Sequence, residues 1–218
     1  MEILREISRG AEAILYKTRF LNIDSVIKYR EPKKYMDPRL DKIIRERRTA
    51  TEAKIMIELR ERGVEVPSIL YVEPEEGIIV MEFIEGVSLR DYLLLEKRDP
   101  TILLKAGEIL GRIHSHNIFH GDPTITNYIV DRYNNLWIID FGLSGYSDEL
   151  EEKAVDLHLT YRSLETLPLP NADLLKQIFF EGYKRVYPDA DKILRRVIEI
   201  RRMGRYVAER KIRGVYRF

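Results

Sequence analysis

The chain has 218 residues, 44% of them hydrophobic and 33% charged, so it can bury a sizeable core as one or two domains and is not a disordered protein. The absence of cysteine excludes disulfides and thiolate metal sites, and the four scattered histidines lack a paired zinc spacing. No segment reaches the ~18 apolar residues of a membrane span, and the first residues lack a secretory pattern, so we expect a cytoplasmic location without membrane contact.

The net charge of +1 conceals a basic C-terminal end. From Asp189 onward the chain has ten Lys or Arg against four Asp or Glu, a net charge of +6, which leaves −5 for residues 1–188. The stretch Arg201–Phe218 also interleaves arginines with aromatic residues, a combination that can neutralise phosphates and stack on bases. This distribution favours an acidic partner at the C-terminal end, with nucleic acid as one candidate.

Residues 2–30 alternate like a small antiparallel meander of three strands. The turn after the first strand contains Gly10 and is followed by Glu12, an odd neighbour for an anionic ligand that Arg9 and nearby backbone amides can offset. An ordinary hairpin turn is the alternative. Lys28 lies in the apolar third strand, where a charged side chain is expected to face either a cleft or solvent.

The pattern over residues 38–62 predicts a long helix that ends at Gly63, a typical C-cap residue. Glu52 lies in the middle of this helix. Two strands follow within residues 66–84, on either side of the turn Pro74–Gly77. These elements compose a predicted N-terminal lobe over residues 1–84.

Residues 85–218 are predicted to be mainly helical, with the basic tail at the end. Helix starts are indicated at Ser88, at Asp99 with Pro100, at Asn171 and at Asp189, since these residue types cap helix N-termini. Apolar residues recur at helical spacing in each of the segments that follow.

The stretch from His120 to Gly142 carries the chemistry. Asp122 is followed five residues later by Asn127, and two short apolar runs around a polar turn then lead to Asp140. Carboxylate and amide oxygens in this order suit phosphoryl transfer, in which they hold magnesium and accept the proton of an attacking hydroxyl. Each residue taken alone can instead serve a turn.

The motif HGDxxxxN followed by DFG resembles the catalytic and metal loops of the protein-kinase-like superfamily. The resemblance implies that Asp122 is the catalytic base, that Asn127 and Asp140 bind magnesium, and that Lys28 pairs with Glu52 and binds the phosphates of ATP.

The same resemblance implies further ATP contacts in residues 1–84. Arg9, Gly10 and Ala11 occupy the place of the glycine-rich loop over the phosphates. The segment MEFIEG resembles the kinase hinge, in which the carbonyl of Glu82 and the amide of Ile84 reach the edge of adenine.

Motifs spread over essentially the whole chain resemble one branch in particular, the small atypical serine/threonine kinases of the KEOPS complex, or PRPK-like family. These motifs are GAEA, TATEA, HGDPTITN, IDFGLS, EEKAVDL and the basic tail. The family resemblance implies an α+β, reduced bilobal protein-kinase-like fold, with a small antiparallel sheet plus one helix in the N-lobe and a short, mainly helical C-lobe. It implies ATP and magnesium as cofactors and activity as a kinase or ATPase.

The implied partners are the threonylcarbamoyl-transferase subunit and the other KEOPS subunits, acting in formation of threonylcarbamoyl-adenosine on tRNA. The basic tail Arg201–Phe218 is the expected tRNA contact. The chain departs from the family pattern at Pro123, which removes an amide donor, and at Ile125, which removes a hydroxyl. These departures affect substrate positioning more than ATP binding.

Only thirteen residues separate Gly142 from Asp156, which resembles the helix aspartate that supports the catalytic loop of kinases. A protein kinase places its long activation segment here, so we expect the acceptor to be water or to be presented by a partner. Three alternatives remain open at this stage: a small-molecule phosphotransferase of the aminoglycoside or choline type, a RIO-type ribosome-maturation kinase, and a nucleotide-sensing module without useful chemistry.

Overall fold

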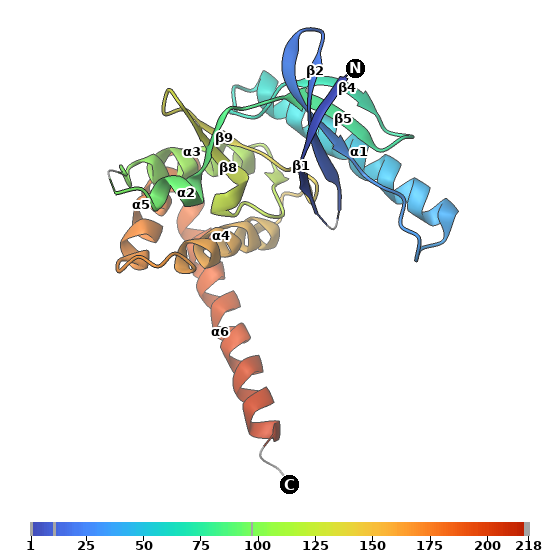
Figure 1. Ribbon diagram of the computed structural model, residues 1–218. Coiled ribbons are helices and arrows are strands. Elements are labelled where there is room, and N and C mark those ends of the chain that lie inside the picture. The colour runs from blue at the N-terminus through green and yellow to red at the C-terminus, as the bar shows by residue number, and fades with distance from the viewer. Residues whose placement is uncertain (1, 11, 97, 216–218) are drawn as a thin grey trace. The chain divides into compact units, whose positions relative to one another are not determined.

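A computed structural model describes residues 2–10, 12–96 and 98–215, with the side chains of 2, 3 and 204–215 left out of the description. The chain forms two compact units (Figure 1). The first contains residues 1–92 and 126–145, and the second contains residues 93–125 and 146–218. The division into lobes 1–84 and 85–218 stays a prediction.

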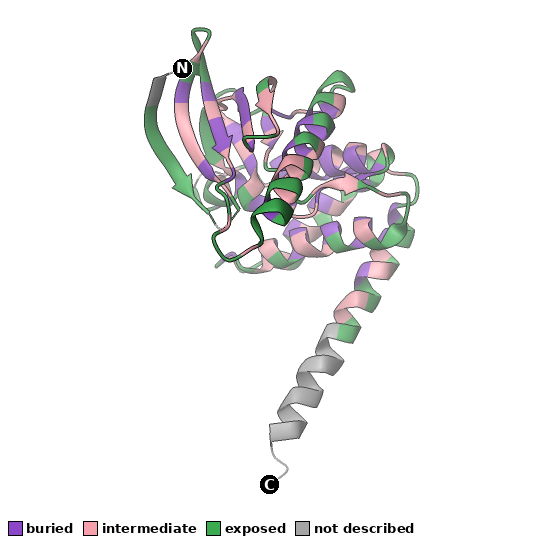
Figure 2. Cartoon of the chain, turned by 90° about the vertical axis from the view of Figure 1, so that its right-hand side faces the viewer, coloured by how far each residue is buried: buried purple, intermediate pink, exposed green. Residues whose placement is uncertain are grey.

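The first unit is built on a five-stranded antiparallel sheet with the order β1-β2-β3-β5-β4. Its elements are β1 (Glu2–Arg9), β2 (Ile14–Phe20), β3 (Ile23–Tyr29), α1 (Pro38–Glu61), β4 (Ile69–Glu73) and β5 (Ile78–Glu82). Edge strand β1 is exposed over residues 4–9, whereas Ile27, Ile79 and Val80 on the inner strands are buried (Figure 2). The core of this unit therefore lies toward the β5–β4 side of the sheet, where α1 packs against inner strand β5 and edge strand β4.

Helix α1 begins and ends as the sequence predicts. The side chain of Asp37 accepts hydrogen bonds from the amides of Arg39 and Leu40, at 3.0 and 3.1 Å, and Pro38 occupies the first turn. Gly63 follows the C-cap with φ +75°, a backbone conformation that favours glycine. The capping residues thus fix both ends of the helix that carries Glu52.

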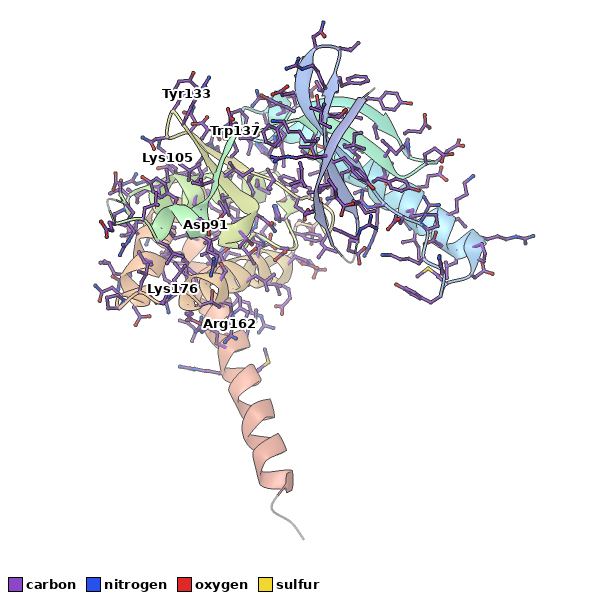
Figure 3. The ribbon with its side chains drawn as sticks, in the orientation of Figure 1. Asp91, Lys105, Tyr133, Trp137, Arg162 and Lys176 are labelled. Carbon is purple, nitrogen blue, oxygen red and sulfur yellow. The ribbon has the colours of Figure 1, made fainter. Side chains whose placement is uncertain are left out.

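A three-stranded sheet, β6-β8-β9, completes the first unit. Its strands are β6 (Gly86–Ser88), β8 (Tyr128–Asp131) and β9 (Leu136–Ile138), and the short helix α2 (Leu89–Leu93) follows β6. In the β8–β9 turn, the carboxylate of Asp131 accepts from the amides of Tyr133 and Asn135 and from the indole Nε1 of Trp137, at 2.8, 2.9 and 3.1 Å. Figure 3 labels Tyr133 and Trp137 on this hairpin. This turn closes the hairpin predicted between residues 128 and 139.

The second unit is mainly helical. Its elements are α3 (Ile102–Ser115), β7 (Ile118–Phe119), α4 (Leu150–Glu165), α5 (Ala172–Val186) and α6 (Ala190–Val215), with η1 (Ile125–Asn127) and β10 (Gly145–Tyr146) at the unit boundaries. Helices α3 and α5 approach closely at two glycines: a Cβ on Gly107 would lie 2.0 Å from the carbonyl oxygen of Phe179, and one on Gly182 would lie 2.0 Å from that of Leu104. Only glycine permits this approach.

The predicted helix starts agree with the structure except at α3. There Asp99 accepts from the amide of Thr101, at 2.9 Å, but the helix begins at Ile102 with Thr101 as its N-cap, because the Asp99 carboxylate holds a turn that precedes the helix. The mixture of antiparallel sheets and helices is the predicted α+β class.

Within the described part of the chain, no helix combines the length and the apolar character needed to cross a bilayer.

Candidate functional site

The first unit brings together three of the residues singled out in the sequence. The Nζ atom of Lys28, on β3, lies 2.7 Å from Oε1 of Glu52 and 2.6 Å from Oδ1 of Asp140. Lys28 and Glu52 are buried, whereas the side chain of Asp140 is 52% exposed. The lysine therefore bridges a buried carboxylate on α1 and an open carboxylate after β9.

Electrostatics keep Lys28 charged. Burial alone would lower the pKa of the Lys28 ammonium, but the carboxylates of Glu52 and Asp140 outweigh it and raise the pKa above its usual value. Breaking a buried ion pair of this kind costs about 3–5 kcal/mol, since it leaves an uncompensated charge. A cation held in this way is suited to bind an anionic group.

Arg30 is a second cation at the same carboxylate, and sequence reasoning missed it. Its Nη2 atom forms an ion pair with Oε2 of Glu52, and its Nη1 atom donates to the hydroxyl of Thr49 at 3.5 Å. Arg30 is 3% exposed. The alternation of side chains along a strand supplies the signal that could have found it, since residues 28 and 30 share one face.

Asp140 has a left-handed backbone, with φ +66°, which is uncommon for residues other than glycine. Its Oδ1 accepts from the amide of Gly142 at 3.3 Å. A Cβ on Gly142 would lie between 3.2 and 3.4 Å from atoms of Asp140, Arg30 and Lys28, so the glycine permits the close packing of the cluster. Backbone conformations of this type gather at functional sites.

Asn127 and Asp140 flank the paired strands β8 and β9, and the amide of Ile139 donates to the carbonyl of Asn127 at 2.9 Å. The amide oxygen of Asn127 and the carboxylate of Asp140 are hard donors, which fit magnesium, an ion that completes its shell with water and phosphate oxygens. No cluster of three His, Cys, Asp or Glu side chains suited to a metal occurs in the described residues. The donor set thus matches a metal carried together with phosphates better than a closed structural metal site.

The turn after β1 is organised by ion pairs. The amide of Gly10 donates to the carbonyl of Ala13 at 3.0 Å, while Ala11 lies outside the described residues. Arg9 forms ion pairs with Glu6 and Glu31, both at 3.0 Å.

The expectation that Arg9 offsets Glu12 is not met. Glu12 forms its ion pair with Arg48, a residue of α1 that lies 36 positions later in the chain. Sequence reasoning had no signal for this long-range partner. The acidic residue beside the turn is therefore neutralised by the helix that also carries Glu52.

The predicted hinge residues follow the sheet. The amide of Glu82 donates to the carbonyl of Ser68 at 2.9 Å, and the carboxylate of Glu82 accepts from the amide of Ser68 at 3.2 Å. Ile84 lies in the extended segment after β5, and its amide makes no hydrogen bond to another residue that the structure describes. An amide in that state can donate to a ligand, as the predicted adenine contact requires.

Asp122 lies in the second unit, in a loop whose backbone amides donate hydrogen bonds to the carboxylate of Asp156 on α4. One oxygen of Asp156 accepts from the amide of His120 at 2.6 Å and the other from the amide of Gly121 at 2.8 Å. His114 connects the same carboxylate, at 3.1 Å, to the hydroxyl of Tyr183, at 2.8 Å. Asp156 is therefore the buried support of this loop, and His114 is part of the same network.

The two departures from the family pattern are accommodated by the backbone. The hydroxyl of Thr160 donates to the carbonyl of Pro123 at 2.8 Å, and the amide of Ile125 donates to the hydroxyl of Ser163 at 3.1 Å. Both partners belong to α4. The loop after Asp122 is thus anchored without the amide and the hydroxyl that this chain lacks.

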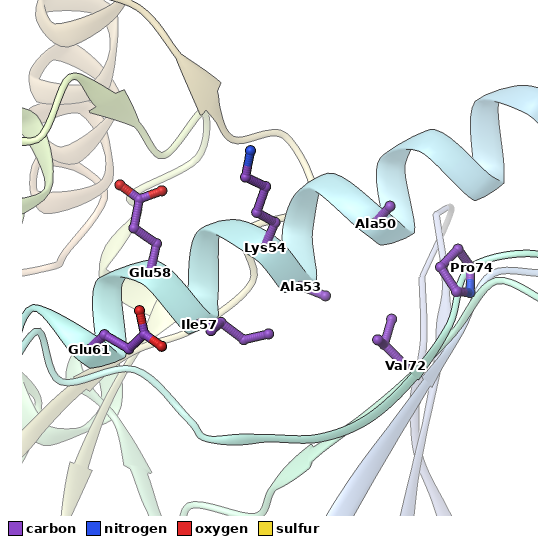
Figure 4. Close-up of a pocket in the computed structure, with 8 residues that line it drawn as sticks. All are labelled: Ala50, Ala53, Lys54, Ile57, Glu58, Glu61, Val72 and Pro74. Atoms are coloured by element: carbon purple, nitrogen blue, oxygen red, sulfur yellow. The ribbon is translucent and has the colours of Figure 1, made fainter.

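The described residues of the first unit line hollows that include the following two. A groove of about 480 Å³ runs between Ala50, Ala53 and Ile57 of α1 and Val72 and Pro74 at β4 (Figure 4). A hollow of about 250 Å³ lies between α1 and the segment after β9, and it is lined by Arg47, Arg48, Thr51, Glu52, Phe141, Gly142, Leu143 and Ser144. Of the two, only the smaller one includes a residue of the Lys28 cluster.

The ABC1 atypical kinase-like domain, a family of related chains, matches residues 9–162. A relative from Methanospirillum hungatei, a probable bifunctional tRNA threonylcarbamoyladenosine biosynthesis protein, is 38% identical over 200 residues, which are 92% of this chain and 36% of the relative. A relative of the same name from Methanocaldococcus jannaschii is 36% identical over 201 residues, which are 92% of this chain and 37% of the relative. The chain thus spans about a third of the length of the curated relatives it matches.

The Rio2 kinase from Chaetomium thermophilum, solved as an ADP/Mg²⁺-phosphoaspartate complex, superposes with a TM-score of 0.62 at 16% identity. The match covers 94% of this chain and 72% of that kinase. At this identity the similarity bears on the fold. The predicted resemblance to small atypical kinases and the predicted kinase-like α+β fold are both confirmed.

Proposed function

Because the chain belongs to the ABC1 atypical kinase-like domain family, we propose that it is an ATP- and magnesium-dependent atypical kinase or ATPase. We further propose that it acts in tRNA threonylcarbamoyladenosine formation as a subunit of the KEOPS complex. The names of the two archaeal relatives support the process. The bridge that Lys28 forms between Glu52 and Asp140 is the observation that carries the nucleotide-binding part.

In this proposal, residues of the first unit bind the phosphates of ATP. Lys28, held by Glu52, binds the phosphate oxygens of ATP, and Asn127 and Asp140 hold magnesium. The metal ion neutralises charge on the phosphates. The turn at Arg9, Gly10 and Ala11 and the hinge residues Glu82 and Ile84 are proposed contacts for the rest of the nucleotide.

Asp122 of the second unit is the proposed catalytic base, which accepts the proton of the attacking hydroxyl. The carboxylate of Asp156 holds the two residues directly before Asp122, through bonds from the amides of His120 and Gly121. These bonds support the proposal, since they hold the backbone next to the proposed proton acceptor.

The acceptor of the phosphoryl group is proposed to be water or a group presented by a partner. Helix α4 begins at Leu150, eight residues after Gly142, so the described chain offers only a short segment where protein kinases hold a peptide. The proposed partners are the threonylcarbamoyl-transferase subunit, the other KEOPS subunits and tRNA, the last through the basic tail Arg201–Phe218. Residues 216–218 of that tail lie outside the described residues, as do the side chains of 204–215.

ATP hydrolysis tests the proposal. We expect slow hydrolysis by the purified chain, an increase when the transferase subunit and tRNA are added, and loss of both rates in Asp140→Ala. Asp173→Ala is the matched control, because its carboxylate is 90% exposed and pairs with Lys176, which keeps a second partner in Glu165. Full activity of Asp140→Ala would contradict the proposal, and turnover of a small alcohol without any protein partner would favour the aminoglycoside or choline type instead.

The RIO-type alternative is supported by the fold alone, since the identity to Rio2 is 16%. The relatives named for tRNA threonylcarbamoyladenosine biosynthesis are more than twice as similar in sequence. The tRNA-modification proposal is therefore the better supported of the two.

A further inference from the structure

Arg30 is a buried arginine in a place where a lysine and a glutamate alone would make the usual ion pair. It follows β3 directly and lies two residues after Lys28, so both side chains leave the same face of the strand. Thr49 and Glu52 lie three residues apart on α1 and share one face of that helix. The two cations and the two helix residues therefore meet between the strand and the helix.

The main chain fixes the position of Arg30. Its amide donates to the carbonyl of Gly77 at 3.0 Å, in the turn between β4 and β5. A Cβ on Gly77 would lie 3.1 Å from the carbonyl oxygen of Arg30, so the turn packs directly on this residue. The Nε atom of Arg30 is buried without a hydrogen bond in the described structure, which is unfavourable, so the ion pair with Glu52 and the bond to Thr49 are what keep the guanidinium inside.

The charges of the cluster indicate what the second cation does. Lys28 and Arg30 carry two positive charges, and Glu52 and Asp140 carry two negative ones. Glu52 is 1% exposed, and a carboxylate buried to that degree requires a counter-charge. Arg30 always supplies one, since a guanidinium does not deprotonate in proteins.

The second cation matters for the proposed metal site, because there the carboxylate of Asp140 would bind a metal ion instead of Lys28. If Asp140 held a metal ion, Lys28 would lose one of its two carboxylate partners. Without Arg30, the positive charge of Lys28 would be fully balanced by the buried carboxylate of Glu52. With Arg30 on its other oxygen, Glu52 is already balanced, and Lys28 retains charge for another anion.

We propose that Arg30 is a positioning residue for nucleotide binding, which balances and orients Glu52 so that Lys28 can bind a nucleotide phosphate while Asp140 holds the metal. This inference rests on the proposed function. It deepens that function by assigning the ion pair between Arg30 and Glu52 a share in the affinity for magnesium-bound nucleotide.

The test compares the affinity for ATP with and without magnesium in four proteins: the wild type, Arg30→Gln, Arg30→Lys and Arg62→Gln. Arg62→Gln is the matched control, because it removes an arginine at the C-cap of α1, where the guanidinium pairs with Glu58 one turn earlier and is 45% exposed. Arg30→Lys keeps the positive charge and provides a folded variant if Arg30→Gln is unstable. Affinity is measured by calorimetric titration and referred to the folded fraction of each protein.

We expect Arg30→Gln to lose roughly 10–100-fold in affinity for ATP with magnesium, as is typical when the support of a ligand-binding residue is removed. Arg30→Lys should recover part of that loss, and Arg62→Gln should bind as the wild type does. If both Arg30 variants bind ATP with magnesium as tightly as the wild type does, this inference is overturned while the proposed function stands. If the wild type itself binds no ATP, the proposed function fails first.

Discussion

Replacing Asp156 by asparagine is expected to destabilise the second unit and to loosen the loop that carries Asp122. The carboxylate of Asp156 accepts from the amides of His120 and Gly121 with different oxygens. Asparagine has nearly the same size but only one oxygen acceptor, and its amide group donates. At least one of the two backbone amides therefore loses its acceptor and faces a donor.

The magnitude follows from these bonds. A hydrogen bond to a charged group contributes roughly 1.5–3 kcal/mol, and a buried donor without a partner costs about 1–3 kcal/mol. Asp156 is 1% exposed, so water does not replace the lost acceptor. We expect Asp156→Asn to lower the free energy of unfolding by about 2–4 kcal/mol.

The assay is urea denaturation followed by circular dichroism, with Asp191→Asn as control. Asp191 is exposed and pairs with Lys184 at 3.0 Å on the surface, so its variant should remain within ~0.5 kcal/mol of the wild type. ATP hydrolysis should fall in Asp156→Asn even at temperatures where the variant is folded. Equal unfolding free energies for Asp156→Asn and the wild type would refute the reasoning about this carboxylate.

Three further substitutions test other parts of the fold. Gly182→Ala should lower the free energy of unfolding by about 1–3 kcal/mol or more, since the added Cβ would overlap the carbonyl of Leu104. The control Glu181→Ala, at an exposed neighbour, should have little effect, and equal losses of stability in the two variants would contradict the close approach of the helices. Asp131→Ala should lower the free energy of unfolding by roughly 0.5–1.5 kcal/mol through the loss of its bonds to the turn, where water reaches the freed amides, and a stability like that of the wild type would argue against this turn. Burial, together with the two arginines nearby, lowers the pKa of His158, so the unfolded chain takes up a proton first as the pH falls through about 6.5 and the folded state loses stability there. His158→Gln should therefore lose less unfolding free energy than the wild type between pH 7 and pH 5, and identical pH dependence would rule out this role.

Helix α1 illustrates what local sequence can predict. The pattern from residue 38 and the glycine at 63 predict its extent, and the structure adds Asp37 as the residue whose side chain caps its start. The start of α3 was placed too early, since Asp99 and Pro100 have the composition of a cap while the Asp99 carboxylate forms a turn instead. Local signals identify elements well and choose between neighbouring caps less well.

In the candidate site as well, some residues could be predicted from the sequence and others could not. The resemblance to kinases predicts the pairing of Lys28 with Glu52, and the structure has this ion pair at 2.7 Å. Arg30 and Arg48 were not found, because their partners are fixed by the packing of α1 on the sheet and not by their neighbours in the chain. Strand alternation alone would have placed Arg30 on the same face as Lys28, but it could not have shown that Arg30 is buried or which residues of α1 it meets.

The calorimetric titration of ATP with magnesium into the wild type and into Lys28→Ala tests the central claim most directly. Lys28 is the residue that joins Glu52 to Asp140, so its removal should eliminate the positive charge proposed to bind phosphate. We predict measurable binding by the wild type and a loss of at least about tenfold in affinity in Lys28→Ala, equal to roughly 1.4 kcal/mol. Equal affinities of the two folded proteins, or no binding by the wild type, would contradict the account.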